Sequence, residues 1–135
     1  MKIELENVKP RDIERRSFEI ITEILGDTKL DAENELVIKR VIHTTADFDY
    51  ARNLRFTPGA VAAGVAALRA GTPIVTDTNM ALAGITRPGL AKVGSAALCY
   101  MADPEVAAAA KAAGTTRAVA SMHRTAQEHP GAIMA

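Results

Sequence analysis

The chain has 135 residues, and its 16 basic and 16 acidic side chains leave no formal net charge at pH 7. This length fits one ordinary domain with its own core, and the balanced charge argues against nucleic acids and anionic membranes as partners, since both need a cationic surface. No apolar run approaches the roughly 18–20 residues that span a bilayer, and the charged N-terminal stretch is unlike a signal peptide, so we expect a soluble, cytoplasmic protein.

The N-terminal part is expected to form two amphipathic helices. Residues 11–25 carry apolar side chains at helical spacing and end before Gly26, which predicts a helix with Ser17 on its apolar face. A lone serine in that position usually donates a hydrogen bond to a backbone carbonyl of its own helix. Asp31 is expected to cap a second helix, which runs to about Thr45.

His43 lies in this second helix, with Arg40 about one turn before it and Asp47 about one turn after it. Side chains at positions i and i+4 of a helix are neighbours, so the Asp47 carboxylate would favour the charged imidazole while Arg40 would oppose it. Such a histidine could donate a proton near neutral pH. The alternative is an Arg40–Asp47 ion pair with His43 as a spectator, and the spacing alone leaves both possibilities open.

The rest of the chain alternates short apolar runs with helices. After an extended piece and turn at LRFTPG, the expected elements are, in order, a small-residue helix over about 58–70, a buried strand in TPIVTD, a loop or short helix in TNMALAGITRPG, a second strand in SAALCYM, and a helix over about 103–113. The run TTRAVASM is either a third strand or the start of a helix. This alternation predicts a single α/β domain over residues 1–135, with a mainly parallel sheet flanked by helices.

Polar side chains follow both predicted strands. Thr76, Asp77 and Asn79 come at the end of the first, and Asp103 comes after the second. Ligands of open parallel sheets bind beyond the carboxyl ends of the strands, so these side chains are candidates for binding a ligand through hydrogen bonds. Helix capping is the alternative for Asp77, and it is the favoured interpretation for Asp103, which precedes a proline.

Three further features bear on chemistry. His123 and His129 are six residues apart, which does not place both on one helical face, so no metal site is expected. Arg117 follows two threonines near the predicted sheet edge, where its guanidinium could bind a carboxylate; ordinary surface exposure is the alternative. Cys99 has no partner for an internal disulfide, and its apolar surroundings favour a buried, inert thiol.

Four segments together resemble the precorrin-8X methylmutase family, which includes the cobalt-precorrin-8 methylmutases. They are, in the family's order and spacing, IERRSFEII, RVIHTTADFDYARNLRF, IVTDTNMALAGI and DPEVAAAAKAAGTTRA. The resemblance implies an isomerase of cobalamin biosynthesis that needs no external cofactor. It would move a methyl group from C-11 to C-12 of a corrin precursor and give hydrogenobyrinate, or cobyrinate from a cobalt-containing substrate.

The resemblance also implies roles for individual residues. The family's histidine matches His43, with proton transfer at the ring C nitrogen as its expected role. The family's active-site serine matches Ser17, and its substrate-contacting arginine matches Arg117. Family members are homodimers with the pocket near the subunit interface, so a homodimer that binds a corrinoid tetrapyrrole is expected.

The family pattern continues beyond HPGAIMA, so we expect the C-terminal third of that pattern to be absent from these 135 residues. Two other hypotheses therefore stay open. One is a non-catalytic corrinoid-binding module or an inactive shortened relative. The other is a nucleotide-binding α/β enzyme, although the sequence contains neither a GxGxxG motif nor a phosphate-binding P-loop.

Overall fold

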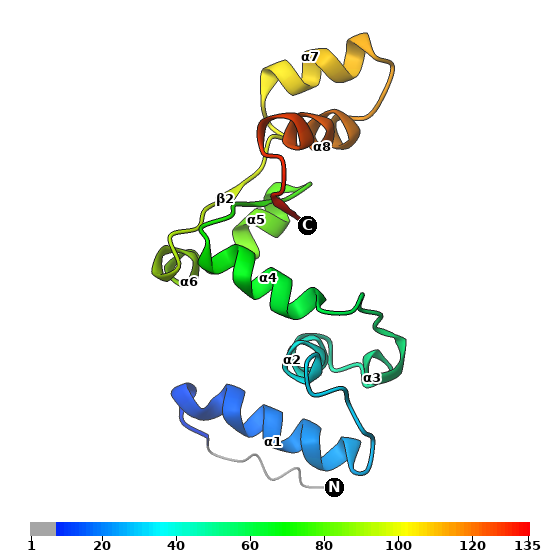
Figure 1. The fold of residues 1–135 in the computed structure, drawn as a ribbon, viewed down its shortest axis with the longest axis vertical. Coiled ribbons are helices and arrows are strands. Elements are labelled where there is room, and N and C mark those ends of the chain that lie inside the picture. Colours follow the sequence, from blue (N-terminus) through cyan, green and yellow to red (C-terminus); the bar gives the residue numbers. More distant parts are fainter. Residues whose placement is uncertain (1–7) are drawn as a thin grey trace, which may run out of the picture. The chain divides into compact units, whose positions relative to one another are not determined.

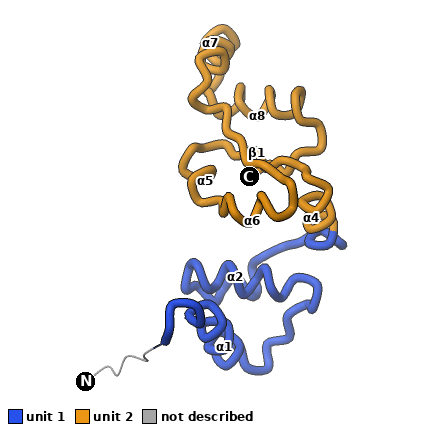
Figure 2. The backbone as a smooth tube through the Cα atoms, turned by 90° about the vertical axis from the view of Figure 1, so that its left-hand side faces the viewer, with its two compact units in different colours: residues 1–62 blue, residues 63–135 orange. Residues whose placement is uncertain are grey.

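The computed structural model describes residues 8–135, and the chain divides into two compact units, residues 1–62 and 63–135 (Figure 2). The contacts within each unit are therefore given separately. The charged stretch that is unlike a signal peptide begins in residues 1–7, which lie outside the described residues. The single domain expected over residues 1–135 stays a prediction.

The first unit is helical. A short turn of 3-10 helix, η1 (Pro10–Asp12), leads into α1 (Ile13–Leu25), which is followed by α2 (Glu35–Thr45) and the short α3 (Tyr50–Asn53) (Figure 1). Ile21 of α1 packs against Ile38 and Ile42 of α2, and these three side chains form the buried core of the unit. Partly buried apolar side chains pack around them: Leu25, Leu30, Phe48, Tyr50, Ala51, Leu54 and Phe56.

Helix α1 confirms the helix predicted over residues 11–25, whereas α2 begins later than predicted. The Asp31 carboxylate accepts a hydrogen bond from the Glu33 N–H at 3.1 Å, which closes a turn ahead of the helix. Asp31 therefore does not cap α2, because a side chain that bonds the backbone two residues on stabilises a turn instead of a helix start. The short helix α3 was not predicted.

The second unit contains a three-stranded parallel sheet with strand order β2-β1-β3. Its strands are β1 (Ile74–Val75), β2 (Ala97–Leu98) and β3 (Ile133–Met134). Its helices are α4 (Ala60–Arg69), which leads into the unit, α5 (Asn79–Gly84), α6 (Arg87–Lys92), α7 (Pro104–Ala112) and α8 (Arg117–Glu128) (Figure 1). In the register of the sheet, Ile74 pairs with Ala97 and Ile133.

This parallel sheet with its helices confirms the predicted α/β class. The runs TPIVTD and SAALCYM supply β1 and β2 as predicted, and Val75 in the central strand is fully buried. The run TTRAVASM forms the start of α8, because the Thr116 side chain accepts from the Val119 N–H and caps the helix. The third strand comes instead from β3, whose two residues were not predicted to pair.

No helix within residues 8–135 is long and apolar enough to cross a bilayer.

At the start of the sheet, the turns that enter β1 and β2 approach each other closely. Gly71 has a φ of 79°, and a Cβ placed on it would lie 3.1 Å from the Gly94 carbonyl oxygen. The left-handed backbone favours glycine at position 71, and a side chain there would also have to displace the Gly94 carbonyl by a few tenths of an ångström.

Candidate active site

His43 of α2 lies against Ser17 of α1 in the first unit. The Ser17 hydroxyl oxygen is 2.7 Å from the His43 Nδ1, and both side chains are half-buried. Ser17 therefore bonds across two helices, and not to a carbonyl of its own helix as a lone serine usually does. This bond occupies Nδ1, so Nε2 is the ring nitrogen through which His43 can exchange a proton with another group.

A serine hydroxyl suits both protonation states of this imidazole. When the ring is protonated, its Nδ1–H donates to the hydroxyl oxygen, and when the ring has given up its Nε2 proton, the neutral tautomer keeps the same Nδ1–H and the same bond. The ring can thus gain or lose a proton at Nε2 without losing its bond to Ser17. A side chain that donates or accepts a proton in a reaction needs this kind of constant orientation.

Asp47 does not orient His43 as predicted. Helix α2 ends at Thr45, because Ala46 adopts a left-handed conformation with a φ of 56°, and the i+4 spacing does not continue beyond that residue. The Asp47 carboxylate accepts from the Asp49 N–H at 2.9 Å and so belongs to the turn that follows the helix. The prediction of an Asp47 carboxylate beside the imidazole is therefore wrong.

Arg40 pairs with Glu14 of α1 at 2.6 Å, so the predicted alternative of an Arg40–Asp47 pair is also wrong. The hydrogen bond from Arg40 is the main cause of a lowered pKa of Glu14, and the same bond raises the pKa of Arg40. The Arg40 guanidinium carbon lies 5.1 Å from the centroid of the Phe18 ring. The same ring meets His43 edge-on, with centroids 5.9 Å apart and planes inclined by 62°.

Sequence reasoning missed Glu14 and Phe18 as neighbours of the histidine. A signal was available, because Glu14 and Phe18 are four residues apart and Arg40 and His43 are three apart. Both spacings place side chains on one helical face. What the sequence did not show is that these two faces meet.

The other predicted ligand-binding residues lie in the second unit, after β1. Thr76 is fully buried, and its Oγ1 donates to the Thr78 carbonyl at 2.9 Å, so its side chain stabilises the turn after the strand. Asp77 and Asn79 are exposed. Thr78 caps α5 by accepting from the Ala81 N–H, so the alternative in which Asp77 caps this helix is wrong.

Arg117 is the first residue of α8 and is exposed to solvent.

Asp103 caps α7 as predicted, and its carboxylate also binds Arg124 of α8 at 2.7 Å. Arg124 binds Glu128 at 2.7 Å as well, and its guanidinium carbon lies 4.6 Å from the centroid of the Tyr100 ring. Arg124, which had no predicted role, thus connects the end of β2 to both α7 and α8.

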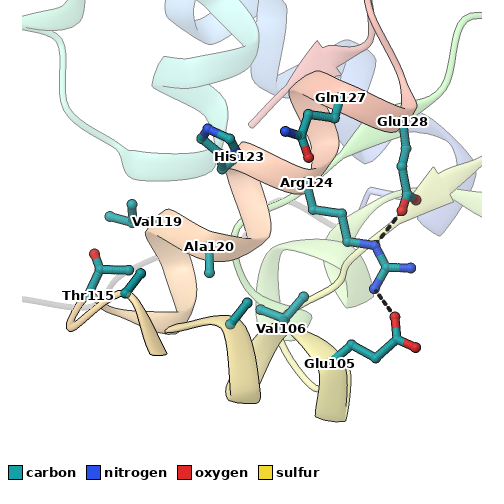
Figure 3. Close-up of a pocket in the computed structure, with 11 residues that line it drawn as sticks. Glu105, Val106, Thr115, Val119, Ala120, His123, Arg124, Gln127 and Glu128 are labelled. Carbon is teal, nitrogen blue, oxygen red and sulfur yellow. Dashed lines mark hydrogen bonds and ion pairs between the residues drawn. The ribbon is translucent and has the colours of Figure 1, made fainter. Parts of the chain in front are cut away.

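The two remaining histidines have different surroundings. The Tyr100 hydroxyl lies 2.6 Å from the His129 Nε2, and burial is the main cause of a raised pKa of Tyr100. His123 lines a cavity of about 530 Å³ between α7 and α8, where Figure 3 shows Arg124 bound to Glu105 and Glu128.

Within residues 8–135, no three His, Cys, Asp or Glu side chains gather as metal ligands. Cys99 is half-buried, which is more exposed than predicted.

Comparisons with known proteins agree with the geometry of the fold. The family model described as Precorrin-8X methylmutase matches residues 12–135. A cobalt-precorrin-8 methylmutase from Priestia megaterium is 39% identical over 128 residues, which are 95% of this chain and 57% of that protein. A cobalt-precorrin-8 methylmutase from Salmonella typhimurium is 44% identical in an alignment of 119 positions that covers 84% of this chain and 57% of that protein.

A solved structure gives the same result. The precorrin-8X methyl mutase from Thermus thermophilus superimposes with a TM-score of 0.78 at 38% sequence identity, over 87% of this chain and 56% of that one. The present chain therefore spans little more than half the length of each of these relatives.

Proposed function

The chain belongs to the precorrin-8X methylmutase family, and from this premise we propose that it acts in the isomerisation of precorrin-8X or cobalt-precorrin-8. The proposed reaction moves a methyl group from C-11 to C-12 of the corrin precursor in cobalamin biosynthesis. Its product is hydrogenobyrinate, or cobyrinate when the substrate contains cobalt. No external cofactor enters this proposal.

The observation that carries the proposal is the pair formed by His43 and Ser17, with 2.7 Å between Nδ1 and Oγ. In the methyl shift, the bond from C-11 to the methyl carbon breaks as the bond to C-12 forms, so no electrons are gained or lost by the substrate. We propose that His43 gives a proton from Nε2 to the ring C nitrogen and takes it back after the shift. Ser17 keeps the imidazole in place during both transfers.

Three exposed residues of the second unit are proposed to bind substrate. Arg117 offers a guanidinium, which suits the carboxylates on the rim of a corrin precursor because it can form two parallel hydrogen bonds to one carboxylate. Asp77 and Asn79 are proposed to bind polar groups of the same ring. Thr76 is proposed to contribute indirectly, because its hydroxyl is bonded within the turn that carries these two residues.

The assembly and location of the protein are also proposals. A homodimer is expected from the resemblance to the family, and a cytoplasmic location from the sequence pattern alone; measurement of the molecular mass by light scattering tests the homodimer. The second candidate function, a corrinoid-binding module without catalysis, is tested together with the first.

The test is to mix the protein with precorrin-8X and to follow formation of hydrogenobyrinate by absorption spectroscopy. The wild-type chain is compared with His43→Ala and with a control, His123→Ala, which changes a histidine of the second unit. Loss of a positioned proton donor is expected to lower the rate by about 10²- to 10⁴-fold, whereas the control keeps the wild-type rate. A wild-type rate in His43→Ala removes this residue from the mechanism.

The binding experiment separates the two functions. Binding of added hydrogenobyrinate without conversion of precorrin-8X favours the non-catalytic module. If the chain neither binds hydrogenobyrinate nor converts precorrin-8X, both functions are contradicted for this chain.

A further inference from the structure

We propose that Arg40 is a positioning residue for His43, and that it acts through the aromatic ring of Phe18. The consequence for catalysis rests on the function proposed above. The positioning itself is a property of the first unit alone.

The imidazole of His43 is held at two points by consecutive residues of α1. Ser17 binds its Nδ1 at 2.7 Å, and the ring of the next residue, Phe18, meets the imidazole in a T-shaped contact with centroids 5.9 Å apart. One hydrogen bond alone allows the imidazole to tilt about the Nδ1 contact. An edge-to-face contact with a second ring limits that tilt, because aromatic pairs favour this arrangement.

The ring of Phe18 is in turn held by Arg40. The guanidinium carbon of Arg40 lies 5.1 Å from the Phe18 ring centroid, which is within the range of a cation–π contact. Glu14, one turn before Phe18 on α1, binds the same guanidinium at 2.6 Å and keeps it over the ring. The order of contacts therefore runs from Glu14 to Arg40, then to Phe18, and from Phe18 to His43.

A purely stabilising role explains this arrangement less well. The side chains of Arg40 and Glu14 are 51% and 59% exposed, and exposed ion pairs contribute little to stability because water screens them. The location of the guanidinium over the ring that touches His43 is what gives the pair a specific effect.

The test is nuclear magnetic resonance of the histidine side chains. The chain has three histidines, and the signals of His43 are identified by their loss in His43→Gln. The wild-type protein is expected to show a nuclear Overhauser effect between the His43 and Phe18 rings. Its His43 ring signals are expected to be those of one ring orientation, held by the bond at Nδ1 and the contact with Phe18.

Arg40→Met removes the guanidinium and keeps an apolar side chain of similar length. Because the ion pair is exposed, this variant is expected to fold; its His43 ring signals should shift, and the nuclear Overhauser effect between the His43 and Phe18 rings should weaken as Phe18 loses its fixed position. Glu14→Gln, also at an exposed position, should shift the same signals by less. The matched control is Arg15→Met, which removes the arginine of the Arg15–Glu19 pair on α1, 2.5 Å apart, and should leave His43 unchanged. Unchanged His43 signals in folded Arg40→Met overturn the positioning role.

Conversion of precorrin-8X gives the second readout. Arg40→Met is expected to lower kcat by about tenfold with KM unchanged, since a misplaced imidazole affects the chemical step and not substrate binding. If His43→Ala is inactive while Arg40→Met keeps both its His43 signals and its kcat, the positioning role is overturned and the proposed function stands. If Arg40→Met shifts the His43 signals while His43→Ala converts substrate normally, the positioning role stands and the function proposed for His43 falls.

Discussion

Replacing Ser17 by alanine removes the hydroxyl that lies 2.7 Å from the His43 Nδ1. Alanine has a higher helix propensity than serine, so α1 is expected to remain intact. The substitution therefore tests the orientation of the imidazole while the helix that carries residue 17 is preserved.

The expected magnitude follows from the two protonation states of His43. A hydrogen bond between neutral groups contributes about 0.5–1.5 kcal/mol net, and one that involves a charged group contributes about 1.5–3 kcal/mol. With proton transfer in the rate-limiting step, a loss of about 1–2 kcal/mol in the transition state lowers kcat by about 5- to 30-fold.

The assay is the kcat for conversion of precorrin-8X by Ser17→Ala, Ser17→Thr and a control, Thr22→Val. The Thr22 hydroxyl donates to the Phe18 carbonyl on the same helix at 2.7 Å, so Thr22→Val also removes one hydroxyl from α1 and should keep the wild-type kcat. Ser17→Thr retains a hydroxyl and should recover most of the rate. A Ser17→Ala protein as fast as wild type, beside an inactive His43→Ala protein, would show that this bond does not orient the imidazole for the reaction.

Three further predictions concern stability. Ile42 is 1% exposed, so Ile42→Ala is expected to lower the free energy of unfolding by about 2–5 kcal/mol. The control Leu36→Ala, at a side chain that is 72% exposed, should change it by less than about 0.5 kcal/mol. Urea denaturation measures both values, and equal effects would contradict a core built on Ile42. Burial raises the pKa of Tyr100, so its neutral form contributes to the free energy of unfolding. This contribution should be complete below about pH 10 and lost as the pH rises through the pKa of the folded state. Urea denaturation at rising pH should show the loss in wild type and not in Tyr100→Phe. Asp103→Ala removes both the cap of α7 and a partner of Arg124, whereas Asp103→Ser restores only the cap. The melting temperature of the serine variant should therefore lie between those of the alanine variant and wild type. Equal melting temperatures for the two variants would show that the cap contributes nothing.

The sequence predicted the elements whose signal is local. Helix α1 and strands β1 and β2 have either apolar residues at helical spacing or short continuous apolar runs, and each formed where expected. Helix α3 has only four residues, which is too short for any periodicity to show. Strand β3 has two residues, as β1 and β2 have, so its length does not explain why it was missed. The start of α8 was ambiguous because its first residues suit either structure, and the Thr116 cap decided between them.

The candidate site shows a similar division. His43 and Ser17 were each predicted to matter, but their contact was not, because they are 26 residues apart in sequence and only the packing of α1 on α2 brings them together. The error at Asp47 has a different cause. Ala46 leaves the helix in a left-handed conformation that glycine usually adopts, and an alanine gives no sequence signal of such an ending.

The described neighbours of the His43 imidazole all come from two successive helices near the start of the chain. The proton transfer proposed for His43 would therefore depend on one continuous stretch of the sequence, residues 14–43. Substitutions at Asp77, Asn79 or Arg117 in the second unit would then alter the proposed substrate contacts and leave the contact between His43 and Ser17 in place.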